Sequence, residues 1–165
     1  MELELGSAIV GAVSIALVAL PVVLIGSSKR KKEKHFKVLL SEFAAKHDCK
    51  LDFHEISGNL AIGMDTSRNF VFFCAETNEQ VNEQIVDLGK IQNCKVIKTS
   101  SMVRNKEGNQ QVIDRLELSF IPMAKAQPEI RLEFFNADVN LQLYGELQAA
   151  EKWSKLINGR LKGKG

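Results

Sequence analysis

The chain has 165 residues, enough for one compact domain and an additional segment, and its formal net charge is +2. Six Lys or Arg and one Glu lie in residues 29–37, whereas residues 38–165 hold 16 basic and 17 acidic residues. These later residues have neither a basic excess nor aromatic side chains interleaved with basic ones, the features that nucleic-acid binding requires. We therefore expect no nucleic acid among the partners.

An uncharged stretch lies near the start of the chain. Residues 6–26 contain no charged side chain, and eleven of these 21 residues are Leu, Ile or Val. As a helix they span about 31 Å, which matches a hydrocarbon core about 30 Å thick. Residues 1–5, MELEL, are acidic, whereas a cleaved secretory signal begins with positive charge. The sequence predicts an uncleaved transmembrane helix over residues 6–26 after a short extracytoplasmic N-terminus.

A basic juxtamembrane segment, residues 27–35, follows this helix. The basic residues near the predicted span are Lys29, Arg30, Lys31, Lys32, Lys34 and Lys37. Positive charge beside a span stays on the cytoplasmic side of the membrane. We expect a single-pass protein of the cell membrane, with its N-terminus outside and its C-terminal domain in the cytoplasm. The same side chains lie where they can contact anionic lipid headgroups.

Small residues recur every four positions within the predicted span. They are Ser7 and Gly11, and Ala8, Ala12 and Ala16. Such a face lets a second helix approach closely, although short side chains also occur in helices that contact only lipid. The oligomeric state is left open.

Residues 36–48 have the spacing of an amphipathic helix. Phe36, Leu39, Leu40, Phe43, Ala44 and His47 fall on one helical face. We expect this face to pack on the domain that follows, and an orientation flat on the membrane is the alternative.

From residue 50 the pattern changes to short apolar runs separated by turn residues, which predicts strands. Seven strands are expected, at residues 51–56, 59–65, 69–76, 83–88, 94–104, 112–122 and 130–138. The polar stretch 77–83 is interpreted as a connection. An amphipathic helix over residues 143–161 and a flexible tail at 162–165 complete the chain.

This order of elements, seven antiparallel strands and one closing helix that contains Trp153, resembles the pleckstrin-homology-like (PH-like) superfamily, in particular bacterial PH-like domains on one membrane helix. The resemblance covers residues 50–161 and implies an α+β fold, a bent antiparallel β-barrel plugged by the C-terminal helix. It also implies that Trp153 is a core residue. Phosphoinositide sites of the superfamily place several Lys and Arg around the first hairpin, whereas residues 50–65 contain only Lys50.

The sequence offers little for catalysis. Cys49, Cys74 and Cys94 are odd in number and lack short spacings, which indicates reduced, buried thiols. Two alternatives are a zinc site from His47, Cys49 and His54, and a nucleophilic cysteine paired with His35, His47 or His54. Neither has the spacing of a known motif, so we expect no metal, cofactor or catalytic residue.

The sequence supports three hypotheses of function. The first is a membrane-anchored module that binds another protein at a strand edge or beside the C-terminal helix. The second is binding of anionic membrane lipid through the basic segment and the domain surface. The third is an enzyme whose site is not recognised in the sequence.

Overall fold

The computed structural model describes residues 29–105 and 108–163. The chain divides into two compact units, Met1–His35 and Phe36–Gly165. The predicted transmembrane helix over residues 6–26 and its small-residue face lie outside the described residues. Within the described ranges, no helix is both long and apolar enough to cross a membrane.

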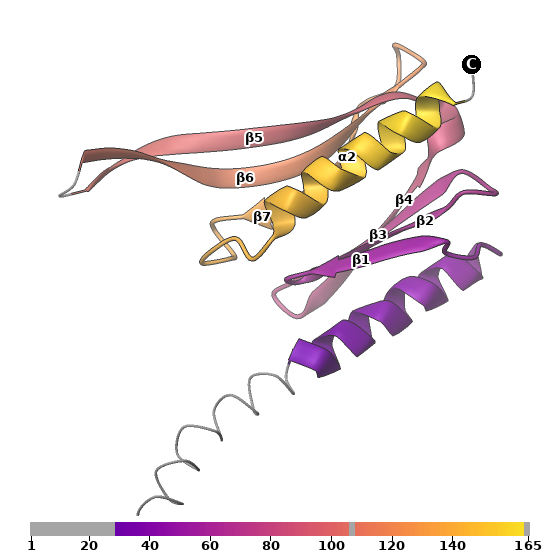
Figure 1. Ribbon diagram of the computed structural model, residues 1–165, viewed down its shortest axis with the longest axis horizontal. Helices are drawn as coiled ribbons and strands as arrows, with labels where there is room; N and C mark the ends of the chain where they lie inside the picture. The colour runs from indigo at the N-terminus through magenta and orange to yellow at the C-terminus, as the bar shows by residue number, and fades with distance from the viewer. Residues whose placement is uncertain (1–28, 106–107, 164–165) are drawn as a thin grey trace, which may run out of the picture. The chain divides into compact units, whose positions relative to one another are not determined.

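A four-stranded antiparallel sheet forms the first half of the second unit (Figure 1). Its strands, in spatial order, are β1 (Phe53–Ser57), β2 (Leu60–Asp65), β3 (Phe70–Thr77) and β4 (Gln80–Asp87). Each strand pairs with the next along the chain, because short turns join them. All six residues of β2 are buried. Such a continuous buried run is expected where a sheet is covered on both faces.

A three-stranded antiparallel sheet follows, joined to the first by the short 3-10 helix η1 (Leu88–Lys90). Its strands are β5 (Ile91–Asn105), β6 (Gly108–Pro122) and β7 (Ile130–Asn136). The chain then enters helix α2 (Glu146–Lys162), which packs mainly along β5. Trp153 of α2 is buried, as the resemblance implied, and its indole N–H donates a hydrogen bond to Glu55 of β1 at 2.8 Å.

The predicted fold class is wrong in its central feature, because the seven strands do not form a closed barrel. They form two separate sheets of four and three strands, and the described strands β4 and β5 do not pair with each other. The separation begins at η1, where the Asp87 carboxylate accepts a hydrogen bond from Gly89 N at 2.8 Å and turns the chain. From Ile91 onward, β5 pairs with β6 instead.

The stretch 77–83, interpreted as a connection, is mostly strand. Thr77 pairs with Gln80, so that only Asn78 and Glu79 form the turn between β3 and β4. Both have positive φ, 52° and 63°, which is the geometry of a two-residue hairpin turn. The polar composition of this stretch reflects a solvent-exposed strand, because residues 80–83 are all exposed.

The two helices also differ from their predicted bounds. One helix covers residues 29–46, so the described part of the basic segment, residues 29–35, and most of the amphipathic segment belong to the same helix. The second helix begins at Glu146 and not at residue 143, because Gly145 has φ 123° and cannot continue a helix.

The core consists of two clusters on opposite faces of the first sheet. The larger lies between the two sheets and α2, where the rings of Phe73 and Phe134 stack at 5.5 Å. The smaller is made by the predicted apolar stripe of the first helix, in which Phe36, Leu40, Phe43 and Ala44 are buried. The Phe43 ring meets the Phe72 ring edge-on at 5.3 Å. This second cluster covers the outer face of the first sheet.

Candidate binding surface

The three cysteines are free and buried, as predicted. Burial raises the pKa of Cys74 and of Cys94 to about 12. Burial, together with the negative charge of Asp65, also raises the pKa of Cys49. Since the thiolate is the reactive form of cysteine, each of these thiols is held in its unreactive state.

The residues considered for zinc do not come together as a ligand set. The Cys49 thiol donates a hydrogen bond to the Asp65 carboxylate, which also accepts from Lys50 N at 2.9 Å and Arg68 N at 2.8 Å. Although burial of Asp65 acts to raise its pKa, these donors lower it overall. His54 lies on β1, in register with Gly63. Over residues 29–105 and 108–163, no three His, Cys, Asp or Glu side chains are arranged to hold a metal ion.

The predicted lipid-proximal residues lie on the first helix. Lys29, Arg30, Lys31, Lys32, Lys34 and Lys37 are all exposed. These charges are therefore accessible from solvent.

The seam between α2 and β5 is closed by polar side chains near the C-terminal end of α2. The Asn158 amide accepts from Cys94 N at 2.9 Å and donates to Cys94 O at 2.7 Å, as a neighbouring strand would. Ser154 donates a further hydrogen bond to Cys94 O at 3.1 Å. About two turns before Asn158 on α2, Glu151 forms an ion pair with Lys98 at 2.7 Å. An extended peptide therefore cannot pair with β5 at Cys94 without displacing Asn158.

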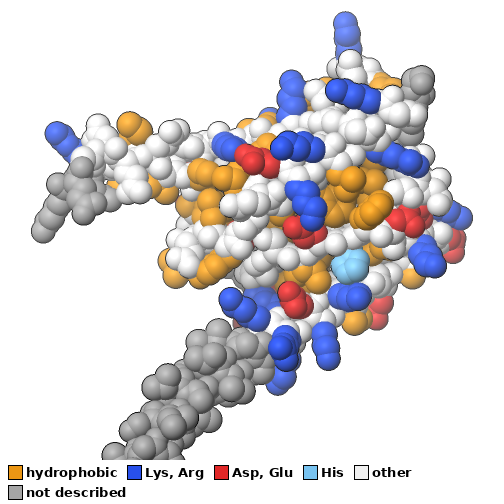
Figure 2. All heavy atoms as spheres, in the orientation of Figure 1, with side chains coloured by type: hydrophobic (Ala, Val, Ile, Leu, Met, Phe, Trp, Pro, Cys, Tyr) orange, Lys and Arg blue, Asp and Glu red, His pale blue; other side chains and the backbone are white. Residues whose placement is uncertain are grey.

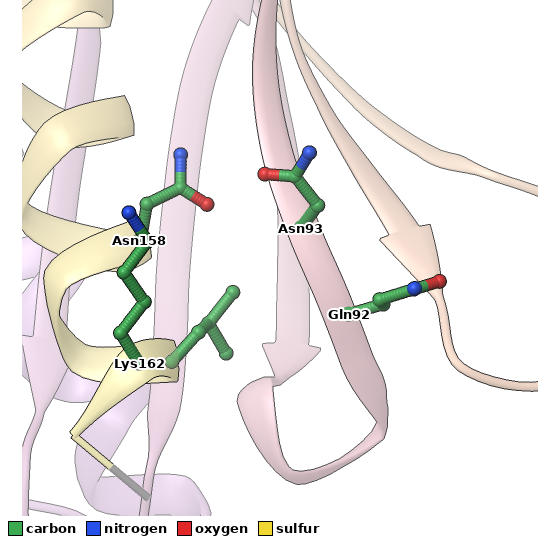
Figure 3. A pocket seen from close by; sticks show the side chains of 5 residues that line it. Gln92, Asn93, Asn158 and Lys162 are labelled. Atoms are coloured by element: carbon green, nitrogen blue, oxygen red, sulfur yellow. The ribbon is translucent and has the colours of Figure 1, made fainter. Parts of the chain in front are cut away.

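A hollow of about 470 Å³ lies at the C-terminal end of this seam (Figure 3). It is lined by Gln92 and Asn93 of β5 and by Asn158, Leu161 and Lys162 of α2. The labelled side chains are amides and one amine, and they come from two elements that face each other across an open gap (Figure 3). Its described lining of amides, one leucine and the Lys162 amine suits polar contact with a ligand.

Beyond Lys98 the β5–β6 hairpin continues as an arm, which we define as residues 99–105 and 108–114. Figure 1 shows the arm extending past the first turn of α2 and past the end of β7. A β-bulge marks its base, because Thr99 pairs with Arg115 and Ser100 with Ile113, which leaves Asp114 as the extra residue. The Ser101 hydroxyl donates to the Asp114 carboxylate at 2.9 Å. The bulge thus separates a covered half of the hairpin from an uncovered one.

The loop between β7 and α2 presents apolar side chains to solvent. Leu141 is fully exposed, and 68% of Tyr144 is exposed. Hydrophobic side chains gather over this loop in Figure 2. The loop is nevertheless tied down, because Ala137 N donates to Asp114 O at 2.8 Å and Asn140 N donates to Asn136 O at 2.8 Å. These are exposed apolar residues on a fixed loop, the arrangement typical of interaction surfaces.

A second hollow, of about 240 Å³, lies against this loop and has a buried carboxylate in its wall. Its lining comes from the β1–β2 turn, the loop and the start of α2: Gly58, Asn59, Val139, Asn140, Leu141, Gln142, Tyr144 and Glu146. Only 5% of Glu146 is exposed, and its carboxylate accepts a hydrogen bond from Tyr144 N. Gly58 makes room for Glu146, since a Cβ on Gly58 would collide with the Glu146 carboxylate. Two more carboxylates, Glu76 and Glu133, line the adjoining recess with Glu146.

No family model, curated protein or solved structure matches this chain. The PH-like relationship therefore stays a prediction.

Sequence reasoning anticipated strand edges and the groove beside α2, but it did not single out Leu141, Tyr144 or Glu146. The signal was present in the sequence, because VNLQLY (residues 139–144) has three apolar side chains and a tyrosine outside any predicted strand.

Proposed function

We propose that this chain is a membrane-anchored protein-interaction module that binds another protein at the hollow between the β7–α2 loop and the β1–β2 turn. The observation that carries this proposal is the exposure of Leu141 and Tyr144 on a loop fixed by hydrogen bonds. Large apolar side chains cost free energy in water, and aromatic residues are enriched at protein interfaces. The membrane anchor rests on the uncharged stretch 6–26 and the basic residues that follow it.

The chemistry of the hollow favours a particular kind of partner. Leu141 and Tyr144 line it, whereas Glu146 lies in its wall and Glu76 lies in the adjoining recess. A partner segment with an apolar side chain next to Lys or Arg would match both features. Because the attraction between the partner's Lys or Arg and these carboxylates is screened by ions, we expect the binding to weaken as the salt concentration rises.

The test compares two variants of the full chain in cells. Leu141→Asp removes an exposed apolar contact without affecting the core, and Val81→Asp makes the same change on β4, at a position that is also exposed. Affinity purification after mild crosslinking, read by quantitative mass spectrometry, should recover partners with the wild type and with Val81→Asp. With Leu141→Asp, the amount of each partner recovered should fall at least tenfold. Equal recovery with both variants would refute this surface as the binding site.

The anchor has its own test. Alkaline carbonate extraction of membranes should leave the full chain in the pellet, since a spanning helix resists this treatment. Release into the supernatant would rule out the transmembrane helix over residues 6–26.

Binding of anionic lipid remains a second candidate, supported by the exposure of all six basic side chains between Lys29 and Lys37. Each can contribute about 1 kcal/mol near an anionic surface. Native mass spectrometry of the detergent-purified chain should detect more bound phosphatidylglycerol than phosphatidylcholine. Changing Lys31, Lys32 and Lys34 to Gln should abolish that preference, and an unchanged preference would eliminate this function for the basic segment.

A further inference from the structure

The outer edge of β6 loses its neighbouring strand halfway along. β7 pairs with β6 only from Arg115 to Phe120. The residue after β7, Ala137, still donates a hydrogen bond to Asp114 O, and the β7–α2 loop leaves the edge of β6 after that contact. Beyond that point, at residues 108–113, the described part of the sheet contains only β5 and β6. At residues 109–113, therefore, no described strand lies beside the outer edge of β6.

This edge lacks the protection that edge strands normally carry. Natural proteins block such edges with charged residues, proline or very short strands. Residues 108–113 are GNQQVI, with no charge and no proline. The other described outer edges all carry charge: Glu55 on β1, Glu83 on β4, Arg104 on the arm portion of β5, and Arg131 on β7.

An uncharged edge has a special consequence for pairing with a second copy. In a two-fold antiparallel pair, the residue at the axis lies opposite its own copy, so a charged residue there would face an equal charge. With the axis at Gln111, the two Gln111 amides face each other, and Asn109 lies opposite Ile113. An amide both donates and accepts hydrogen bonds, so Gln111 can bond to its own copy.

The exposed valines of the arm support the same pairing. Val112 lies on the same face of the arm as Val103, since Ser101 pairs with Val112 and Val103 with Gln110. Val112 is 39% exposed and Val103 is 42% exposed. In the two-fold pair, the Val112 side chains of the two copies become diagonal neighbours across the new strand pair, which removes apolar surface from water.

We propose that two copies of this chain associate through antiparallel pairing of residues 109–113, centred on Gln111, which joins their arms into one four-stranded sheet of order β5-β6-β6-β5. The association uses the outer edge of β6, whereas the hollow proposed for another protein lies between the β7–α2 loop and the β1–β2 turn. Self-association and binding of another protein are therefore separate properties of the molecule.

Disulfide trapping tests the geometry directly, in the full chain purified in mild detergent. Directly opposite residues in an antiparallel pair have Cα atoms about 4.5–5.5 Å apart, which suits a disulfide. Gln111→Cys should therefore crosslink to its own copy under mild oxidation. The matched control is Met102→Cys, which lies directly across from Gln111 on β5 and is 69% exposed. In the proposed sheet the two Met102 positions are three strand spacings apart, about 14 Å, and should not crosslink.

We expect Gln111→Cys dimers to form at least tenfold faster than Met102→Cys dimers. Equal rates would overturn the proposal, because they would indicate random collision. Crosslinking of Gln111→Cys in cells to a different protein, with no self-crosslink, would overturn it as well and would assign the edge to an extended segment of that protein.

A charge-exchange experiment gives an independent equilibrium measurement. Sedimentation equilibrium in density-matched detergent should find a dimer for the wild type. Gln111→Lys and Gln111→Glu should each be monomeric, because like charges would meet at the axis, and their equimolar mixture should be dimeric again. A wild type that stays monomeric at micromolar concentration refutes the pairing. So does a dimer that persists in both variants, since it must use another surface.

Discussion

The two halves of the β5–β6 hairpin are made by the same pair of strands but have opposite surroundings. In the first half, α2 covers one side and β7 extends the sheet, so that Leu116, Leu118 and Phe120 are completely buried. In the arm, Met102, Val103 and Val112 are exposed, and α2 and β7 do not reach them. Strand pairing alone therefore does not show that a strand contributes to the stability of the fold. What covers the pair decides whether a residue contributes to stability or is available for binding.

The largest expected effect lies in the covered half. Leu118→Ala should lower the free energy of unfolding by about 2–5 kcal/mol, because Leu118 is fully buried and its truncation leaves a cavity. Urea denaturation followed by circular dichroism measures the change. A loss below 1 kcal/mol would mean that the covered half is not part of the stable core.

The next effect concerns the seam between α2 and β5, in the covered half. Asn158→Ala should cost about 1–3 kcal/mol, because Cys94 N–H and C=O lose partners at 2.9 and 2.7 Å in a partly buried place. Asn158→Asp is an informative control, since it can still accept from Cys94 N but cannot donate to Cys94 O. The same denaturation measurement should place Asn158→Asp between the wild type and Asn158→Ala.

A third prediction concerns pH and Cys94, in the covered half of the hairpin. The folded pKa of Cys94 is raised from 9.0 to about 12, so the unfolded chain releases this proton more readily. The resulting stability is fully present below pH 9 and decreases as pH rises from 9 toward 12. At pH 10 the loss from Cys94 is about 1.4 kcal/mol relative to neutral pH.

Cys94→Ala provides the control for this pH dependence. Although it loses some packing at every pH, its stability should decline less steeply between pH 8 and 10 than that of the wild type. Parallel profiles for the two proteins would show that Cys94 does not ionise on unfolding. Denaturant midpoints measured across this range provide the data.

The smallest expected effect lies in the arm. Met102→Ala should change stability by less than about 0.5 kcal/mol, since its side chain is mostly in water. Hydrogen exchange should likewise be faster at arm amides than in the covered half of the same strands. A cost above 1 kcal/mol would mean that the Met102 side chain is covered in the folded protein.

Local patterns predicted the elements but not their assembly. The apolar stripe from Phe36 to Ala44 and the seven apolar runs identified the first helix and all seven strands, because burial on one or two faces leaves a periodic signal. Strand β4 was predicted too short, since a solvent-exposed strand such as residues 80–83 has the composition of a loop. The start of α2 was set by the backbone of Gly145, which a side-chain pattern at Leu143 does not reveal.

The closed barrel was a wrong prediction for a different reason. Whether consecutive strands such as β4 and β5 pair depends on the direction that η1 gives the chain. That turn is held by the Asp87 cap and by hydrogen bonds to distant residues, such as Leu88 N to Asn69 O, which a local pattern does not reveal. The exposed surface was equally hard to foresee. Leu141 and Leu143 are similar in the sequence, but Leu143 packs against the core and Leu141 lies in water.

Trp153 gives the molecule a built-in optical reporter. It is the only tryptophan in the chain, it is almost completely buried, and its indole N–H is bonded to the Glu55 carboxylate. A nearby negative charge and a dry environment both affect indole emission, so the fluorescence of the whole protein reports on one place, the contact between α2 and β1. Undocking of that helix would shift the emission to longer wavelength, whereas events confined to the arm would leave the spectrum unchanged. The chain can therefore signal, without any added label, which of its two regions has responded.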